Sequence, residues 1–149
     1  MADLTDPAGY SLWTREILRF NDLDTVGHVN NNAYGVFFEN GRVKAFRRAL
    51  AAVEAAGGSV PYDWAVRRTE TDFLKEMHAP GEITVGTRFE RFGNTSVRVE
   101  QAVFKDGECT CTAVNVVVCF DPVARKSTPI PQEMRDALIE LSARGGENT

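Results

Sequence analysis

The polar stretch NDLDTVGHVNNNAYGVFF, at residues 21–38, carries the side chains best suited to chemistry. It holds two acids, a glycine, a histidine and four asparagines, and then becomes aromatic and helix-like. The start of a helix presents unpaired N–H groups and a partial positive charge, which can stabilise negative charge on a carbonyl oxygen. A carboxylate just upstream, Asp24, could attack that carbonyl or activate a water molecule. The stretch therefore predicts either a surface loop or an active site at a helix start.

Two kinds of metal site compete for the same residues. The D-x-D-x-x-G opening is similar to a calcium loop, but Val26 stands at the fifth position and Ala33 at the twelfth, where oxygen ligands are required. A transition-metal site from Asp22, Asp24 and His28 lacks support, because the chain has two histidines in all and no clustered cysteine–histidine spacing. We therefore expect no metal and no other cofactor.

The composition excludes several classes of protein. With 149 residues, 43% of them hydrophobic, the chain is the size of a single globular domain, residues 1–149. A net charge of −4 argues against general nucleic-acid binding. The N-terminus does not resemble a signal peptide, and no run approaches the ~20 apolar residues that span a bilayer. Three cysteines do not suggest a disulfide framework, and the motifs of serine hydrolases and of nucleotide-binding folds are absent. We expect a cytoplasmic protein that binds neither nucleic acid nor membrane.

One long helix is predicted over residues 31–56. Its apolar stripe recurs at spacings of three and four residues, with members Tyr34, Phe37, Phe38, Gly41, Ala45, Ala49 and Ala52. The small residues in the stripe would let the helix lie close against a sheet, and Gly57 and Gly58 would end it.

Alternating apolar residues and turn residues predict five strands, at 11–20, 62–74, 82–92, 97–103 and 109–120. Short turns at 93–96 and 105–107 make hairpins, so the sheet should be antiparallel. The expected fold is α+β, a five-stranded antiparallel sheet wrapped around one central helix, with a short C-terminal helix at 132–144. Residues 1–9 and 144–149 should be loose tails. The cysteines at 109, 111 and 119 should share one strand face as small buried hydrophobes.

The motif DLDTVGHVNNNAY closely resembles the signature of hotdog-fold acyl-CoA thioesterases of the 4-hydroxybenzoyl-CoA thioesterase type. The order of elements over residues 11–121 is also similar to that fold. The resemblance implies hydrolysis of an acyl-CoA thioester to a carboxylic acid and CoA. It implies that Asp24 is the catalytic carboxylate and that Asn31 supplies the backbone N–H that polarises the thioester carbonyl. Gly27 would let the loop turn, and His28 and Asn30 would order the site or border the substrate.

The resemblance also nominates residues outside this loop. Tyr34 would line an acyl pocket, and the turn that contacts CoA in some relatives corresponds to Asn94, Thr95 and Ser96. Glu39 is the alternative carboxylate, because other hotdog thioesterases use an acid on the central helix. It follows Asn31 by ~12 Å at 1.5 Å per residue, so it ranks second. The arginines available for CoA phosphates are Arg67, Arg68, Arg88, Arg91, Arg98 and Arg125.

Three further expectations concern partners and alternatives. The sheet's uncovered face and edges favour pairing with another copy of the chain. Members of the thioesterase family that the chain resembles work as dimers or tetramers with sites at subunit interfaces, so we expect a homodimer or homotetramer. Acyl-carrier-protein thioesterase activity, or a non-catalytic acyl-binding hotdog module, remains an alternative function. HAPG, at 78–81, resembles the histidine motif of hotdog dehydratases, but the rest of that motif is absent.

Overall fold

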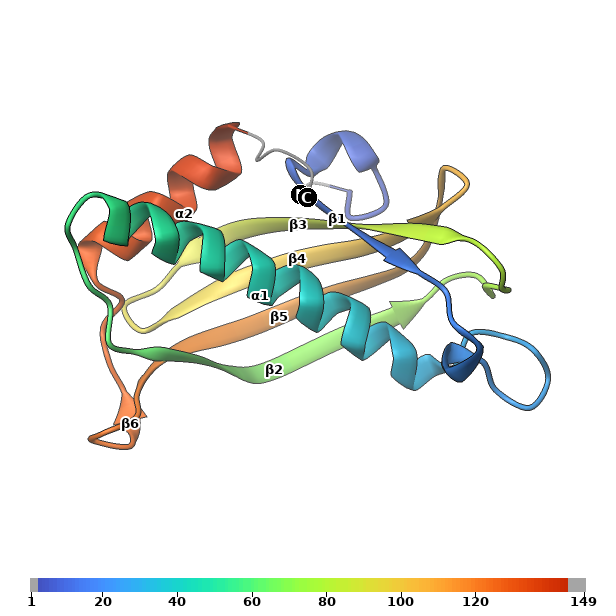
Figure 1. The fold of residues 1–149 in the computed structure, drawn as a ribbon, viewed down its shortest axis with the longest axis horizontal. Coiled ribbons are helices and arrows are strands. Elements are labelled where there is room, and N and C mark those ends of the chain that lie inside the picture. The colour runs from blue at the N-terminus through green and yellow to red at the C-terminus, as the bar shows by residue number, and fades with distance from the viewer. Residues whose placement is uncertain (1–2, 145–149) are drawn as a thin grey trace.

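An antiparallel sheet curls around one long helix in the computed structural model, which describes residues 3–144 (Figure 1). The elements are β1 (Leu12–Ile17), α1 (Asn31–Ala55), β2 (Asp63–Phe73), β3 (Glu82–Phe92), β4 (Ser96–Lys105), β5 (Glu108–Asp121), β6 (Lys126–Ser127) and α2 (Gln132–Arg144), with 3-10 turns at Pro7–Gly9 and Phe20–Asp22. The strand order is β1-β3-β4-β5-β2, and the short β6 pairs with β5. The predicted hotdog architecture, including the C-terminal helix, is confirmed. None of the helices in this part of the chain is long and apolar enough to cross a membrane.

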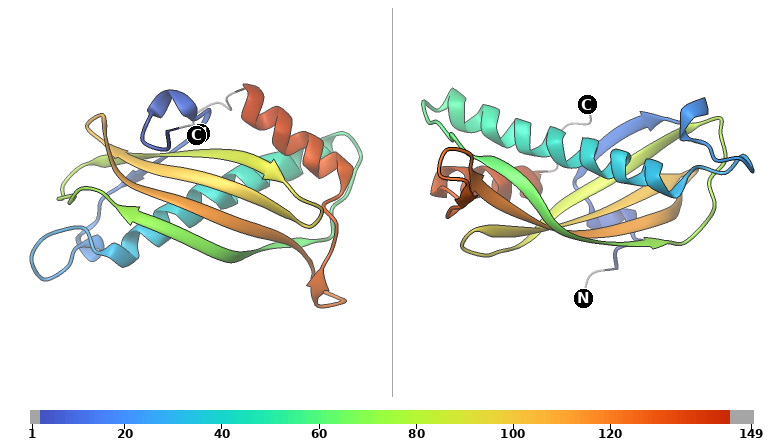
Figure 2. Two further views of the ribbon diagram at one scale, coloured as in Figure 1. Left: turned by 180° about the vertical axis from the view of Figure 1, so that it is seen from behind. Right: turned by 90° about the horizontal axis from the view of Figure 1, so that it is seen from below.

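The long helix forms and ends where its sequence pattern predicts. The predicted stripe is buried from Tyr34 to Ala49, whereas Ala52 is exposed and Val53 is buried instead. Figure 2 shows α1 lying along one face of the sheet. Gly57, at φ +88°, takes the left-handed conformation that closes the C-terminus, and the Gly58 amide donates to the Val53 carbonyl at 2.9 Å.

The first predicted strand is shorter than expected. β1 ends at Ile17, and Phe20–Asp22 forms a 3-10 turn. The Asp22 side chain accepts a hydrogen bond from the Arg19 amide at 2.8 Å, which satisfies a backbone group that a strand would have paired in its ladder.

The predicted tails are described only in part, since residues 1–2 and 145–149 lie outside the described residues. Before β1, the Gly9 carbonyl accepts a hydrogen bond from Arg88 Nη1 at 3.1 Å, and the Tyr10 hydroxyl donates to the Leu4 carbonyl at 2.6 Å. These contacts fasten the segment before β1 to the sheet.

The cysteines do not share one face, contrary to the sequence-based expectation. Phe104 pairs with Cys109 but Val103 pairs with Cys111, so β5 carries an extra residue at a bulge. A one-residue shift moves a side chain to the other face, and Cys109 packs away from the cluster that holds Cys111. Burial raises the pKa of Cys111 to about 12 and that of Cys119 to about 11, so both remain thiols and act as small hydrophobes.

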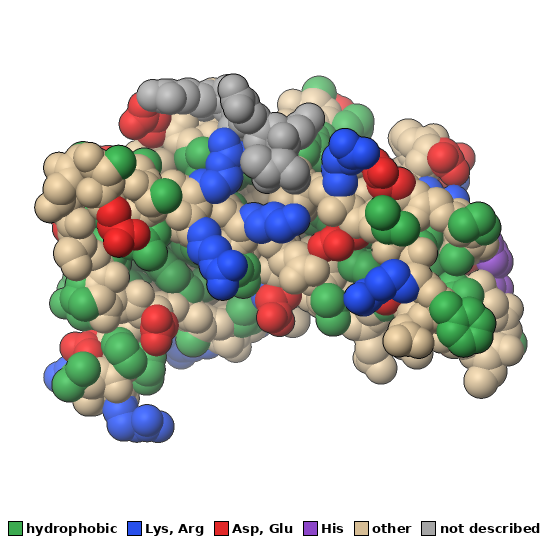
Figure 3. All heavy atoms as spheres, in the orientation of Figure 1, with side chains coloured by type: hydrophobic (Ala, Val, Ile, Leu, Met, Phe, Trp, Pro, Cys, Tyr) green, Lys and Arg blue, Asp and Glu red, His purple; other side chains and the backbone are tan. Residues whose placement is uncertain are grey.

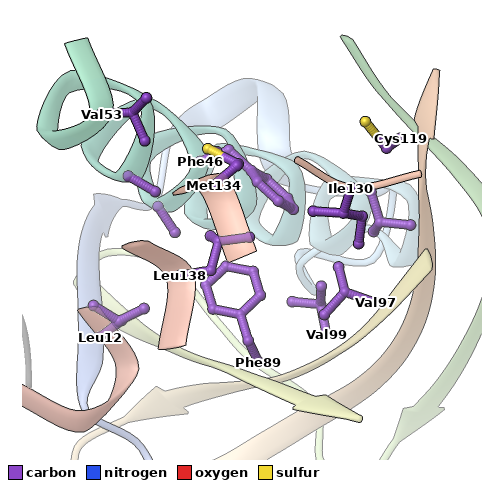
Figure 4. Close-up of a cluster of buried hydrophobic side chains, with 13 residues drawn as sticks. Leu12, Phe46, Val53, Phe89, Val97, Val99, Cys119, Ile130, Met134 and Leu138 are labelled. Atoms are coloured by element: carbon purple, nitrogen blue, oxygen red, sulfur yellow. The ribbon is translucent and has the colours of Figure 1, made fainter. Parts of the chain in front are cut away.

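Two hydrophobic clusters make up the core beneath α1. The first lies under the C-terminal half of α1, where Met134 and Leu138 of α2 meet Phe46 and Phe89 (Figure 4). The second surrounds Phe37 in the N-terminal half. A large apolar side chain that is fully buried contributes roughly 1.5–3 kcal/mol, so both clusters hold the helix on the sheet.

A row of polar side chains, buried except for Thr69 on the edge strand, separates the two clusters. Gln101 Nε2 donates to the main-chain carbonyl of Phe38 at 2.9 Å and to Thr87 Oγ1 at 3.0 Å. Asn115 Nδ2 donates to Gln101 Oε1 at 3.0 Å, and the Thr69 hydroxyl donates to Asn115 Oδ1 at 2.8 Å. The polar row therefore crosses β3, β4, β5 and β2 and bonds directly to the middle of α1.

Gly41 allows α1 to approach this polar row. A Cβ at Gly41 would lie 3.0 Å from Gln101 Nε2 and 3.1 Å from Thr87 Oγ1. Because Gln101 is buried and hydrogen-bonded, it cannot retreat without losing its partners.

We expect Gly41→Ala to lower the free energy of unfolding by about 1–3 kcal/mol, because overpacking outweighs the better helix propensity of alanine. Gly35→Ala is the matched control, since a Cβ there would meet no described atom within 4 Å. It should raise the free energy of unfolding by about 0.5–1 kcal/mol. Urea denaturation measures both, and equal stabilisation by the two substitutions would contradict the close approach.

Candidate active site

The loop before α1 is a tight turn closed by its own backbone. Leu23 and Val29 form an antiparallel bridge, the Asp24 amide donates to the His28 carbonyl at 2.8 Å, and the Gly27 amide donates to the Asp24 carbonyl at 3.2 Å. Gly27 has φ +82°, a conformation that glycine adopts without strain. The loop between Asp24 and His28 has three residues and ends on a left-handed one, which explains why a glycine stands between the acid and the histidine.

The two acids of the motif have different surroundings. Asp24 Oδ1 accepts hydrogen bonds from the amides of Val26 at 2.9 Å and His28 at 3.0 Å. Its Oδ2 has no hydrogen-bond partner within residues 3–144. Asp22 is 5% exposed and ion-paired with Arg19 at 3.2 Å. Asp22 therefore braces the loop, whereas Asp24 holds the loop with one oxygen and leaves the other unengaged.

The first turn of α1 presents one unsatisfied amide. Asn30 is the N-cap, and its side-chain oxygen accepts from the Asn32 amide at 2.9 Å. Its carbonyl accepts from the Ala33 amide, also at 2.9 Å. No group in the described part of the chain accepts from the Asn31 amide. An unpaired N–H at the positive end of a helix dipole is a suitable donor to a developing oxyanion.

Asp24 and Asn31 line the same cavity of about 370 Å³. The full lining is Asp24, His28, Val29, Asn31, Tyr34, Phe73, Leu74, Lys75 and Glu76. The rings of Tyr34 and Phe73 lie 5.5 Å apart and form an apolar wall. Burial raises the pKa of Tyr34 above its ordinary value. Tyr34 therefore serves as an uncharged wall of the cavity.

Four residues at the end of β2 and directly after it line the cavity, and none of them was a candidate on sequence grounds. Phe73, Leu74, Lys75 and Glu76 reach the cavity because the chain returns beside the loop, where the Val29 amide donates to the Met77 carbonyl at 2.8 Å. No local spacing signals this contact, since the two segments are far apart in sequence.

Some nominated residues lie far from Asp24 within one chain. Asn94, Thr95 and Ser96 form the β3–β4 turn, at the opposite end of the sheet from the loop (Figure 2). Glu39 is exposed on α1 and does not line the Asp24 cavity.

Two of the nominated arginines are already engaged on the other face of the sheet. Arg88 is 5% exposed, donates from Nε to Glu100 at 2.8 Å and stacks on Tyr10. Arg98 donates to the same carboxylate at 2.8 Å. Thr87 faces α1, so its neighbour Arg88 must point away from the helix. Arg88 is therefore not available to CoA in this fold.

Known proteins resemble this chain over most of its length. A family model described as the thioesterase-like superfamily matches residues 18–138. A thioesterase from Thermus thermophilus, solved with coenzyme A and zinc, is 29% identical, with a TM-score of 0.79 over 91% of this chain and 97% of that one. The PA5185 protein from Pseudomonas aeruginosa is 30% identical, with a TM-score of 0.78 over 91% of this chain and 94% of that one. A protein from Bacillus stearothermophilus, described as a predicted thioesterase, is 28% identical, with a TM-score of 0.73 over 86% and 95%. No curated protein matches the chain.

Substitution of Asn30 separates helix capping from substrate contact. Asn30→Ala removes the oxygen that accepts from the Asn32 amide and should lower the free energy of unfolding by about 0.5–2 kcal/mol. Asn30→Ser keeps a capping oxygen and should retain most of that stability. Chemical denaturation compares the two, and unchanged stability in Asn30→Ala would contradict the capping role.

Proposed function

We propose that this chain, which belongs to the thioesterase-like superfamily and is a thioester hydrolase, cleaves acyl-CoA to a carboxylic acid and CoA with Asp24 as its catalytic carboxylate. One observation carries the proposal: Asp24 and Asn31 line one cavity, and within residues 3–144 Asp24 has one oxygen and Asn31 its amide without a hydrogen-bond partner. The coenzyme A bound to the Thermus relative supports CoA as the leaving group.

The proposed chemistry begins with the thioester carbonyl oxygen accepting a hydrogen bond from the Asn31 amide. One such donor typically stabilises an oxyanion by about 3–4 kcal/mol. Two routes then use Asp24. In the first, its Oδ2 attacks the carbonyl carbon, the CoA thiolate leaves, and water hydrolyses the resulting acyl anhydride. In the second, the carboxylate takes a proton from a water molecule that attacks the same carbon. Turnover in ¹⁸O-water distinguishes the routes, because label enters Asp24 only in the first, when water attacks the aspartyl carbonyl of the anhydride.

The β2 edge supports a proposal of dimerisation. β2 is an 11-residue edge strand, with Val66 46% exposed and Phe73 50% exposed. A long exposed edge is a template for pairing with another strand. Antiparallel pairing of two β2 strands brings the Asp63 end of one copy beside the Phe73 end of the other.

This pairing would complete the site with groups from a second copy. Ser96 pairs with Val118 and Asp63 pairs with Phe120, two residues apart near the end of β5, so the β3–β4 turn lies at the Asp63 end of β2. The turn of one copy would then approach the Asp24 end of the other. An apolar cavity of about 450 Å³ also borders the Asp63 end, and Phe46, Leu50 and Trp64 are among its lining residues. We assign the acyl group to this cavity.

Two alternative functions predict different results in one thiol-release assay. Hydrolysis of an acyl-carrier-protein thioester uses the same groups with a protein leaving group. A non-catalytic acyl-binding module would bind acyl-CoA without releasing thiol. A free-thiol release assay with a panel of acyl-CoA thioesters and one acyl-carrier protein separates the three functions and identifies the acyl group.

We expect Asp24→Asn to lower kcat by about 10²–10⁴-fold. The amide oxygen can still accept from the amides of Val26 and His28, so the loop persists while the negative charge is lost. Glu39→Gln is the matched control and should retain wild-type activity. Free-thiol release measures both variants, and full activity in Asp24→Asn would falsify the mechanism.

Val66→Lys should place a charge in the β2–β2 interface and reduce the mass in solution from that of a dimer to that of a monomer. Hydrolysis should fall with it, because the site needs the second copy. Val123→Lys is the control, because Val123 is 91% exposed between β5 and β6. It should change neither the mass in solution nor the rate of hydrolysis. Sedimentation measures the mass, and a fully active wild-type monomer would contradict the proposed dimer.

A further inference from the structure

His28, Glu76 and His78 form a cluster that the proposed hydrolysis does not use as a unit. His28 and His78 form an antiparallel bridge, and the adjacent Val29 amide donates to the Met77 carbonyl at 2.8 Å. Residues directly opposite each other in such a pair point to the same side. Glu76 precedes His78 by two residues, and its carboxylate faces both imidazoles. The backbone pairing thus gathers two imidazoles and one carboxylate.

The cluster has dimensions close to those of a metal site. Glu76 Oε2 lies 3.4 Å from His28 Nε2 and 3.8 Å from His78 Nε2, and one ligand atom from each residue lies within 4.8 Å of the others. Tetrahedral zinc, with bonds of about 2.0–2.1 Å, separates its ligand atoms by about 3.3 Å. The side chains of Glu76 and His78 are 68% and 59% exposed, so rotation about their own bonds can close the difference.

The three side chains of the cluster do not form close hydrogen bonds with one another. Both imidazole–carboxylate distances exceed the usual 2.7–3.2 Å of an N–H···O hydrogen bond. The neighbouring cation, Lys75, is ion-paired with Glu108 and so has its own carboxylate partner. The Glu76 carboxylate therefore remains available to a cation held between the two imidazoles.

We propose that His28, Glu76 and His78 bind one divalent transition-metal ion of the zinc class. Imidazole nitrogen with one carboxylate suits Zn²⁺ and its neighbours, whereas Mg²⁺ and Ca²⁺ prefer sites made of oxygen alone. Three protein ligands leave the fourth position to water.

The site lies at the rim of the Asp24 cavity. His28 and Glu76 line that cavity. In Figure 3, histidine side chains, in purple, are visible at one edge of the molecule. A bound ion and its water would narrow access for a substrate. The metal site itself does not depend on the proposed hydrolysis, because its ligands are set by the fold.

Titration of the metal-free full-length protein tests the site without substrate. Calorimetry with Zn²⁺ should give one ion per chain, Co²⁺ should give the visible absorption of a low-symmetry site, and Mg²⁺ should not compete. His78→Gln and Glu76→Gln should each weaken binding at least about 10-fold, the loss typical even of residues that only support a metal ligand. Glu133→Gln, at an exposed acid on α2, is the matched control and should bind like wild type. Absence of binding in the wild type, or unchanged affinity in His78→Gln, would overturn the proposal.

A second measurement connects the ion to the cavity and rests on the proposed function. Zn²⁺ should inhibit thioester hydrolysis by the wild type at the concentration at which it binds, and His78→Gln should resist that inhibition. Equal inhibition of both proteins would show that zinc acts elsewhere, and the link to the cavity would be wrong. If the protein hydrolyses no thioester, the proposed function fails, but the metal site is still tested, because the metal titration needs no substrate.

Discussion

Two hydrophobic clusters hold α1 on the sheet, and the hydrogen bond from the buried Gln101 side chain to the main-chain carbonyl of Phe38 fixes its position there. A buried amide that loses its partner costs about 1–3 kcal/mol, so the helix cannot slide or roll without a large loss of stability. Gly41 supplies the space for this contact. Because a helix is stiff, holding its middle also holds its first turn. The location of the Asn31 amide, ten residues before Gly41, therefore follows from a contact in the centre of the core.

Chemically similar residues in the motif differ through their hydrogen bonds. Asn30 and Asn31 are neighbours, yet Asn30 uses its side chain as a helix cap, whereas Asn31 leaves its amide unpaired among the described residues. Asp22 is buried against Arg19, and Asp24 keeps one oxygen unengaged. A carboxylate that is already paired must lose that partner before it reacts, so the unengaged acid is the better suited to catalysis. The polar run is thus both a structural turn and the border of a cavity.

One chain carries the parts of the proposed site at opposite ends of its sheet. The loop and the helix start lie at one end, and the β3–β4 turn lies at the other (Figure 1). An exposed β2 edge connects the two ends and gives a second copy a place to pair. The proposed dimer would join the complementary ends of two copies, and antiparallel symmetry would then account for the distance between these groups within one chain. The His28–Glu76–His78 cluster, in contrast, is complete within a single chain.

Much of the fold could be predicted because its signals are local. The 3.6-residue period of α1, the alternation in β3 and β4 and the glycine at the end of the helix all act within a few residues. The motif in the loop likewise identified Asp24 and Asn31 as candidates. Other features needed the folded chain. The bulge that separates Cys109 from Cys111 depends on pairing with β4, and Glu76 and His78 meet His28 only through a backbone bridge between distant segments. The sequence by itself determined which groups are available for chemistry, whereas tertiary pairing decided which of them share a cavity, because contacts between distant segments leave no local period.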